Sequence, residues 1–381
     1  MTKHNIKRTY KINELVKAGQ VLVIYGPRRS GKTTLVQEYI NSLTTKFNTL
    51  YESGDNLTTQ TILGSMNTGK ILAHVEGLNM YVLDEAQNIT NIGKALKIIV
   101  DNRPDLIVIA TGSSSFDLAN KIGEPLVGRR EIVTLYPLAM EELNKNYSRH
   151  ILDDGLHSIL TYGLYPQVYS AETNFEKESK LQELIDGYLL KDIFALEQIQ
   201  APAKLLHLIK LLAQYIGQPI SSSKLASDVG LNQKTVDRYL DLLEKTFVIK
   251  KIMPFANKMS QSLKFKPKYY FYDLGIRNAL LGDFSDVTKR VDIGSIWENF
   301  CFIERIKRNE YKRESHPKYY FYRSYQNKNE IDIIEEYNGY KAFECKWNSD
   351  KAHISLSDWD TQYPDSKISI INKSNFIKYL V

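Results

Sequence analysis

Hydrophobic and polar positions alternate in blocks along the first third of the chain. From residue 21, the short runs VLVIY, NTLYES, MYVLDEA and LIVIATG are separated by stretches with helical spacing, the first of which starts near Lys32. Short buried strands that alternate with helices predict a parallel sheet with helices on its faces. We therefore expect an α/β domain over residues 1–140.

The pattern changes after residue 140. Residues 141–215 carry apolar residues at helical spacing, as in LQELIDGYLLKDIFAL, and no clear strand, which predicts an all-helical lid or connector. Residues 216–290 predict a helix, a turn, a second helix and a β-wing, the pattern of a winged helix. Residues 291–381 predict one helix, three strands, a helix and a last strand, which is again α/β.

Composition narrows the class of protein. The 381 residues are 43% hydrophobic and 25% charged, which excludes disordered and fibrous chains. The N-terminus lacks the apolar core of a signal peptide, and no window of about 18 residues is uncharged and apolar, so we expect neither secretion nor a membrane partner. The two cysteines, Cys301 and Cys345, are too few for a disulfide framework. These features predict a cytoplasmic protein.

A phosphate-binding motif follows the first predicted strand. The segment matches G-x-x-x-x-G-K-[ST] in full and stands between a strand and a helix, as the motif requires. Its glycines let backbone amides face phosphates, Lys32 can reach the β- and γ-oxygens of ATP, and Thr33 offers a hydroxyl to Mg²⁺. The predicted nucleotide-binding residues are Gly26, Pro27, Arg28, Arg29, Ser30, Gly31, Lys32, Thr33 and Thr34.

Further candidates for ATP hydrolysis end two later strands. Asp84 and Glu85 follow the run MYVL, where Asp84 would hold Mg²⁺ and Glu85 would polarise the attacking water. Ser113, at the end of LIVIATG, is a candidate sensor of the γ-phosphate, and a plain serine-rich turn is the alternative. Arg129 is a candidate arginine finger, which would require a homo-oligomer if it acts on a neighbouring subunit.

Several of these stretches together resemble a family of predicted AAA+ ATPases that carry a C-terminal domain of unknown function 4143. The resemblance rests on GPRRSGKTTL, YVLDEAQ, ATGSSS, GRREIVTLYPLAMEEL, YGLYPQVY, KYYFYDLGIRNALLG and WENF, in that order along the chain. It implies an N-terminal domain that binds ATP.

The net charge of +6 lies in one stretch, because residues 216–290 hold 13 Lys and Arg against 7 Asp and Glu. A basic stretch with a helix-turn-helix pattern, in which Asn232 is placed to cap the second helix, predicts contact with DNA. The expected base-reading side chains are Gln233, Lys234 and Arg238. The lysines expected on or near the wing, facing phosphates, are Lys250, Lys251, Lys258, Lys264, Lys266 and Lys268. Asp237 and Asp241 on the same helix leave open a module that only packs or docks proteins.

The last segment contains a pattern that resembles the PD-(D/E)xK nuclease fold. Glu298 lies on a predicted helix, Asp332 on one strand, and Glu344 and Lys346 on the next. Side chains two residues apart share a face of a strand, so Glu344 and Lys346 point the same way. Asp332 and Glu344 could hold Mg²⁺ and Lys346 could orient water, with Glu298 completing the site. The alternative is a solvated charged face.

Two functions fit these residues. The first is an ATPase that couples ATP and Mg²⁺ to DNA binding through the winged helix, with Mg²⁺-dependent DNA cleavage by the last segment as an extension. The second is a nucleotide-switched regulatory or scaffold protein whose nuclease-like segment is inactive.

Overall fold

The structure is a computed structural model, and its chain contacts divide into two compact units. The N-terminal unit holds Arg8–Pro137 with Lys245–Phe247, and the C-terminal unit holds the remainder, chiefly Leu138–Glu244 and Val248–Val381. None of the helices in the described part of the chain is both long and apolar enough to cross a membrane. The structure describes residues 6–43, 47–113, 126–190, 201–255, 266–323, 330–348, 359 and 363–381.

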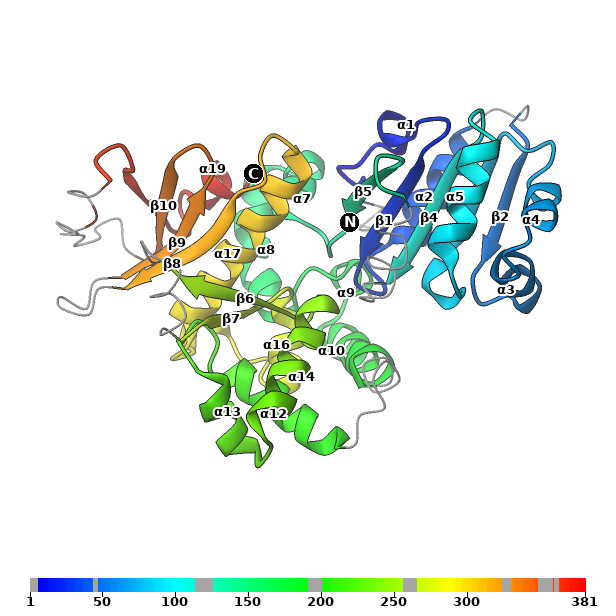
Figure 1. Cartoon of the computed structure of the whole chain (residues 1–381). Helices are drawn as coiled ribbons and strands as arrows, with labels where there is room; N and C mark the ends of the chain where they lie inside the picture. Colours follow the sequence, from blue (N-terminus) through cyan, green and yellow to red (C-terminus); the bar gives the residue numbers. More distant parts are fainter. Residues whose placement is uncertain are drawn as a thin grey trace. The chain divides into compact units, whose positions relative to one another are not determined.

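The N-terminal unit is built on a five-stranded sheet in the order β2-β3-β4-β1-β5, in which every pairing is parallel (Figure 1). This confirms the predicted parallel sheet. The strands are β1 (Val21–Gly26), β2 (Thr49–Ser53), β3 (Met80–Asp84), β4 (Ile107–Ser113) and β5 (Arg130–Thr134). The helices are α1 (Ile12–Leu15), α2 (Lys32–Ser42), α3 (Leu57–Gly64), α4 (Thr68–His74), the short 3-10 helix η1 (Ala86–Asn88) and α5 (Ile92–Asn102).

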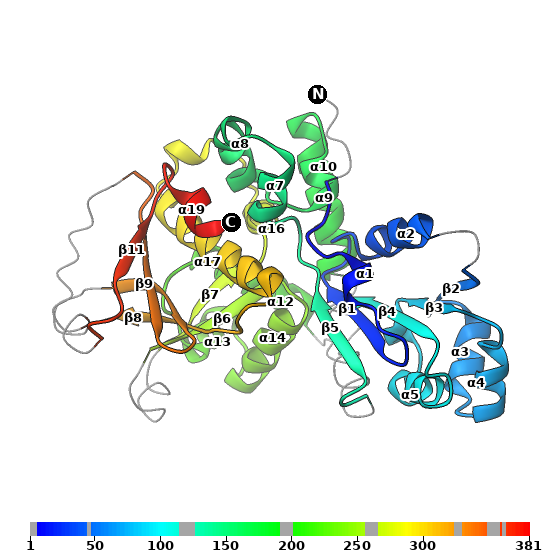
Figure 2. The same cartoon turned by 90° about the horizontal axis from the view of Figure 1, so that it is seen from above.

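Helices cover both faces of this sheet. Helices α3, α4 and α5 lie on one side of it and α2 on the other (Figure 2). The first face is apolar because Val23, Tyr81 and Val108 from neighbouring strands join the core cluster that includes Leu63 of α3 and Leu96 of α5. With both faces covered, the carboxyl ends of β1, β3 and β4 are left as the open edge.

The C-terminal unit starts with helices, which agrees with the predicted helical stretch. These are α7 (Met140–Asn146), α8 (Arg149–Tyr162), α9 (Pro166–Tyr169), α10 (Asn174–Leu184), the π-helical η2 (Ile185–Leu190) and α12 (Pro202–Gln214). Next come α13 (Ser222–Val229), α14 (Gln233–Lys245), α16 (Leu274–Leu281), the 3-10 helix η3 (Val287–Lys289), α17 (Ile293–Lys312) and, at the end of the chain, α19 (Phe376–Leu380).

Caps stabilise both ends of α13 and the start of α14. The hydroxyl of Ser221 accepts the amide of Lys224, and Gly230 closes α13 with φ of 64°. The side chain of Asn232 accepts the amide of Thr235 at 2.8 Å, which is the predicted N-cap of α14.

A six-stranded mixed sheet completes this unit, in the order β11-β10-β9-β8-β6-β7. The hairpin β6–β7 pairs antiparallel, and β6 also pairs parallel with β8 at Met253 and Tyr320. The strands after the helix-turn-helix therefore belong to the C-terminal sheet, and no boundary between compact units falls near residue 290. The helix predicted between the last two strands lies largely outside the described residues. The strands are β6 (Ile249–Pro254), β7 (Lys268–Phe271), β8 (Lys318–Arg323), β9 (Glu330–Glu336), β10 (Tyr340–Cys345) and β11 (Ile368–Ile371).

One buried lysine fastens the hairpin to its neighbours. Lys268 on β7 is 1% exposed, and its Nζ lies 2.8 Å from Glu298 Oε1 on α17 and 2.5 Å from Glu330 Oε1 on β9. Burial acts to lower the pKa of Lys268, but the charges of Glu298, Glu330 and Asp332 outweigh it and raise the pKa, so the ammonium stays charged. The expectation that Lys268 faces DNA phosphates is wrong, because its side chain is buried between carboxylates.

We predict that Lys268→Met destabilises the C-terminal unit by on the order of 3 kcal/mol, because it leaves two carboxylates without their shared cation. The measurement is denaturant unfolding monitored by tryptophan fluorescence, since Trp297 and Trp359 are buried in this unit. Lys266→Met, on the exposed residue two positions away, is the matched control and should change the free energy of unfolding by less than about 0.5 kcal/mol. Equal stability of the two variants would show that the ion pairs contribute nothing.

Candidate functional site

The G-x-x-x-x-G-K-T motif forms a loop between β1 and α2, at the carboxyl edge of the N-terminal sheet. Gly31 precedes α2 with φ of 98°, and Arg29 has φ of 60°. Positive φ values of this kind are typical of loops whose backbone amides bind anions. A Cβ at Gly26 would lie 2.1 Å from the carbonyl oxygen of Leu135. Glycine is therefore required at Gly26 by close packing as well as by its φ of 147°.

Lys32 starts α2 with its ammonium turned into the loop. Its Nζ donates to the carbonyl oxygens of Gly26 and Pro27, both at 2.9 Å. Burial lowers the pKa of Lys32 to about 8, although Glu85 and Asp84 act in the opposite direction. An ammonium held against loop carbonyls can exchange these oxygens for those of a phosphate.

Asp84, at the end of β3, accepts hydrogen bonds from hydroxyl groups on three other elements. Its Oδ2 accepts Thr33 Oγ1 and Tyr51 Oη at 2.7 Å each, and its Oδ1 accepts Thr111 Oγ1. The predicted pair for Mg²⁺, Thr33 and Asp84, is thus brought together. Hard oxygen atoms from a carboxylate and a hydroxyl, beside a phosphate loop, suit the coordination of Mg²⁺.

Glu85 and Ser113 are linked by a residue that the motif analysis missed. Gln87 Nε2 donates to Glu85 Oε2 at 2.5 Å and to Ser113 Oγ at 3.0 Å. Ser113 reaches this place because β4 lies between β1 and β3 in the sheet and pairs with Gly26 at its end. The only signal for Gln87 was its position two residues after Glu85 in YVLDEAQ.

The other residues of the loop differ in exposure. Ser30 is buried, whereas Arg29 and Thr34 are exposed. Arg8 was also missed: its NH1 donates to the carbonyl of Ser30 at 2.6 Å. No local pattern marks Arg8, because its partner is 22 positions away.

Arg129 lies at the other edge of the sheet. The residue after it, Arg130, pairs with Val21 at the start of β1, whereas the phosphate loop follows the end of that strand. Arg129 forms an ion pair with Asp101. Six residues of extended strand, about 20 Å, separate this edge from the loop. Arg129 therefore cannot act on the site of its own subunit, and the finger hypothesis requires a second subunit.

The predicted DNA-reading residues lie on the exposed side of α14. Gln233, Lys234 and Arg238 are exposed, and Gln233 Nε2 also donates to Ser222 Oγ at 3.2 Å. Of the predicted phosphate contacts, Lys251 and Lys266 are exposed, while Lys258 and Lys264 lie outside the described residues. Lys250 is paired with Glu244 at 2.7 Å.

The four predicted nuclease residues come together in the C-terminal unit. Asp332 Oδ2 accepts the amide of Cys345 at 2.7 Å, and Glu344 Oε1 lies 2.6 Å from Lys346 Nζ. Burial, helped by the charge of Glu298, raises the pKa of Asp332 well above its usual range, with Lys268 opposing. Burial also raises the pKa of Glu344. We name Glu298, Glu330, Asp332 and Glu344 the carboxylate cluster.

This cluster fits a cation only in part. Glu298, which was expected to complete the metal site, is instead held by Lys268 and by Tyr270 Oη at 2.5 Å. Glu344 Oε2 is buried and has no hydrogen-bond partner among the described residues. Within that part of the chain, no group of three or more His, Cys, Asp or Glu has the arrangement of a metal site. A divalent cation would therefore rest on Asp332 and Glu344.

Family models match three consecutive stretches. Residues 18–144 match an AAA domain, residues 153–287 match a domain of unknown function, DUF8612, and residues 293–378 match a second domain of unknown function, DUF4143.

Curated relatives share about a quarter of their residues with this chain. An uncharacterized protein of Mycobacterium tuberculosis is 27% identical over 345 residues, covering 89% of this chain and 73% of that protein. An uncharacterized protein of Haemophilus influenzae is 26% identical over 329 residues, covering 81% and 80% respectively. A third, from Methanocaldococcus jannaschii, is 26% identical over 346 residues, covering 78% and 71%.

Similar solved structures include proteins bound to DNA or nucleotide. The Aeropyrum pernix ORC1 protein in complex with DNA aligns over 69% of this chain and 87% of its own, with 12% identity and a TM-score of 0.36. AMPPCP-bound DnaA from Aquifex aeolicus covers 59% and 81%, with 14% identity and a TM-score of 0.26. These likenesses are too distant to support an argument about function. The AAA match contains all five strands of the N-terminal sheet, whereas the six-stranded sheet is divided between two matches, with β6 and β7 in DUF8612 and β8 to β11 in DUF4143. The chain carries an AAA domain and, at its C-terminal end, a DUF4143 domain.

Proposed function

We propose that this protein is an AAA+ ATPase that binds ATP with Mg²⁺ at the N-terminal unit and couples nucleotide turnover to DNA binding. One observation carries the proposal. Lys32 and Thr33 on α2, Asp84 and Glu85 at the end of β3, and Ser113 at the end of β4 meet at the carboxyl edge of one parallel sheet. Such an edge is where open α/β sheets bind ligands.

Each residue of this edge has a role in the proposed reaction. The amides between Gly26 and Lys32 would hold the β-phosphate, with the Lys32 ammonium on the β- and γ-oxygens. Thr33 and Asp84 would hold Mg²⁺, which neutralises phosphate charge when bound. Glu85 would polarise the attacking water.

A linked pair of side chains would orient this reaction. Gln87 fixes Glu85 relative to Ser113, so that the water and the γ-phosphate are contacted by joined groups. A second copy of the chain would supply Arg129, if this residue acts as a finger. Its place at the opposite edge of the sheet agrees with a role between subunits.

The DNA-binding part of the proposal rests on α14 and its surroundings. Gln233, Lys234 and Arg238 are exposed on the second helix of a helix-turn-helix, the place from which such helices contact base edges. Lys251 and Lys266 would meet phosphates, as would Lys264, which lies outside the described residues.

DNA cleavage by the C-terminal unit is an extension of this proposal. Asp332 and Glu344 would hold Mg²⁺, and Lys346 would face the scissile phosphate. The carboxylate of Glu344 raises the pKa of Lys346 despite its partial burial, which disfavours Lys346 as a general base. Its ammonium would instead stabilise charge on the phosphate oxygens.

A nucleotide-switched regulatory or scaffold protein with an inactive nuclease-like unit is the second candidate. The contact between Lys268 and Glu298 favours it, because this ammonium takes up a carboxylate that was expected to bind metal. The two candidates share ATP binding and differ in what the C-terminal unit does.

We predict that Lys32→Ala weakens binding of a fluorescent ATP analogue by about 100-fold or more, because the phosphates lose a charged donor. Glu85→Gln should keep binding and lower ATP hydrolysis by about 100-fold. Lys94→Ala, at an exposed lysine of α5, is the control for both. Binding by Lys32→Ala at wild-type strength would exclude the assigned nucleotide site.

The DNA-binding part of the proposal predicts that the affinity for duplex DNA depends on salt concentration. In fluorescence anisotropy, log K should fall linearly with log salt, and Lys251→Ala and Lys266→Ala, at the expected phosphate contacts, should each reduce the slope by about 1. Lys210→Ala, at an exposed lysine of α12, should leave the slope unchanged. A flat slope for the wild type, or no binding at low salt, supports the scaffold candidate.

The cleavage extension predicts Mg²⁺-dependent nicking of supercoiled plasmid that Asp332→Ala and Lys346→Ala abolish. Lys341→Ala changes an exposed lysine on the same strand as Glu344 and should nick like the wild type. Nicking that persists in both site variants would come from a contaminant, and no nicking by the wild type would support the inactive unit.

A further inference from the structure

Arg8 bridges two main-chain carbonyls of the N-terminal unit. Its NH1 donates to Ser30 in the phosphate loop, and its NH2 donates to Tyr136, which follows β5, both at 2.6 Å. The two partners are 106 positions apart in sequence. A guanidinium can hold both because its donors form a rigid planar fork, whereas a lysine ammonium is a single point.

Arg8 contacts the phosphate loop at Ser30, where the backbone conformation is constrained. Ser30 stands between Arg29 and Gly31, which both have positive φ, at 60° and 98°. The direction of the Ser30 carbonyl therefore depends on the conformation of the loop as a whole. When loop amides and Lys32 turn to a phosphate, this carbonyl is in the segment that must adjust.

The other contact lies on residues 135–140, which we name the connector. The connector runs from the end of β5 to the start of α7, and the boundary between the two compact units falls within it, after Pro137. Its side chains are buried throughout, with exposures of 0–5% outside Pro137. Pro137 fixes its own φ and restricts the residue before it, so a displacement of Tyr136 is poorly absorbed there.

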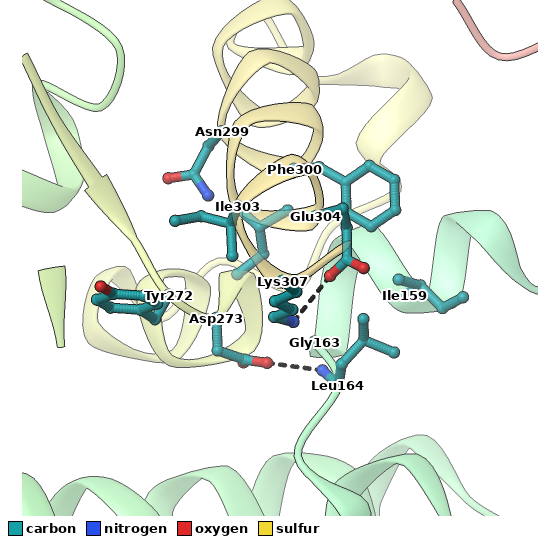
Figure 3. Close-up of a pocket in the computed structure, with 11 residues that line it drawn as sticks. Ile159, Gly163, Leu164, Tyr272, Asp273, Asn299, Phe300, Ile303, Glu304 and Lys307 are labelled. Atoms are coloured by element: carbon teal, nitrogen blue, oxygen red, sulfur yellow. Dashed lines mark hydrogen bonds and ion pairs between the residues drawn. The ribbon is translucent and has the colours of Figure 1, made fainter. Parts of the chain in front are cut away.

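The far end of the connector is clamped inside the C-terminal unit. Lys307 Nζ donates to the carbonyl of Leu138 at 2.9 Å, and Glu304 Oε2 accepts the amide of Met140 at 2.7 Å. The amide of Leu138 donates to the carbonyl of Leu164 at 2.8 Å. Figure 3 shows Glu304 and Lys307 on α17, paired with each other beside Leu164. A shift of the connector therefore reaches α17, the helix that also carries Glu298.

We propose that Arg8 is a positioning residue that couples the conformation of the phosphate loop to the conformation of the connector. A change in the connector would in turn change the C-terminal unit. Arg8 holds the loop at Ser30 and the connector at Tyr136, so the two move together. This inference rests on the proposed function, because a nucleotide must bind the loop to change it. The role of Arg8 adds the structural path by which nucleotide binding would change the connector and the C-terminal unit.

The test compares nucleotide binding with the response of the connector in the full chain. Arg8→Gln removes the charge and the fork, Arg8→Lys keeps the charge with one point of contact, and Lys7→Gln changes the exposed neighbour as the matched control. A fluorescent ATP analogue measures affinity. Hydrogen–deuterium exchange of the amides of residues 135–143, with and without a non-hydrolysable ATP analogue and Mg²⁺, measures the response.

In the wild type and in Lys7→Gln, the analogue should change the exchange rate of the connector amides by about fivefold or more. Arg8→Gln should bind nucleotide within about threefold of the wild type and lose most of this change, and Arg8→Lys should retain part of it. A full response in Arg8→Gln would overturn the proposal, as would a loss of nucleotide affinity of about tenfold or more, which would make Arg8 a binding residue.

Measurements on the wild type alone distinguish failure of the role of Arg8 from failure of the proposed ATPase function. If the wild type binds nucleotide and its connector does not respond, the role of Arg8 fails and the ATPase proposal stands. If the wild type binds no nucleotide, the proposed function itself fails.

Discussion

The close approach of Gly26 to the carbonyl of Leu135 constrains the residues that form the proposed nucleotide site. A hydrogen bond joins the end of β1 to the chain after β5, because the amide of Leu135 donates to the carbonyl of Tyr25 at 2.7 Å. This packing leaves no room for a Cβ at Gly26. The loop amides, Lys32 and Arg8 are all placed relative to this contact, so the site and the start of the connector form one structural element.

The C-terminal unit depends on a different principle, which is charge compensation inside the protein. Arg305 pairs with Glu335 at 2.5 Å, with both side chains 4% exposed, and Lys307 pairs with Glu304 at 2.8 Å. Removing charges from water costs free energy that only close, well-oriented partners offset. Such ion pairs are favourable only when their side chains are closely aligned, so they determine which strands and helices pack together. Lys268 has this role for the hairpin β6–β7, which it holds against α17 and β9.

The sequence allowed prediction of features that depend on neighbouring residues and obscured those that depend on distant ones. The loop motif, the strand before it and the cap at Asn232 are local patterns, and they were predicted. Lys268 was misread because its partners are 30 and 62 positions away. The same effect reduces the basic charge of residues 216–290, since Arg277 pairs with Asp292, and Lys268 pairs with Glu298 and Glu330, all outside that stretch. A count of charges shows how many exist, and only the fold shows how many remain at the surface.

The two candidate Mg²⁺ sites differ in what already surrounds their carboxylates. The partners of Asp84 include the hydroxyls of Thr33 and Tyr51, neutral groups that can rotate to offer oxygen atoms to a cation. The carboxylate cluster instead faces the ammonium groups of Lys268 and Lys346, which repel a divalent ion. In the first site the ammonium of Lys32 is held by the carbonyls of Gly26 and Pro27 and not by Asp84, whereas in the second site two ammonium groups contact carboxylates of the cluster directly. Cation binding at the carboxylate cluster therefore depends on how far Glu298 and Glu330 neutralise the ammonium of Lys268.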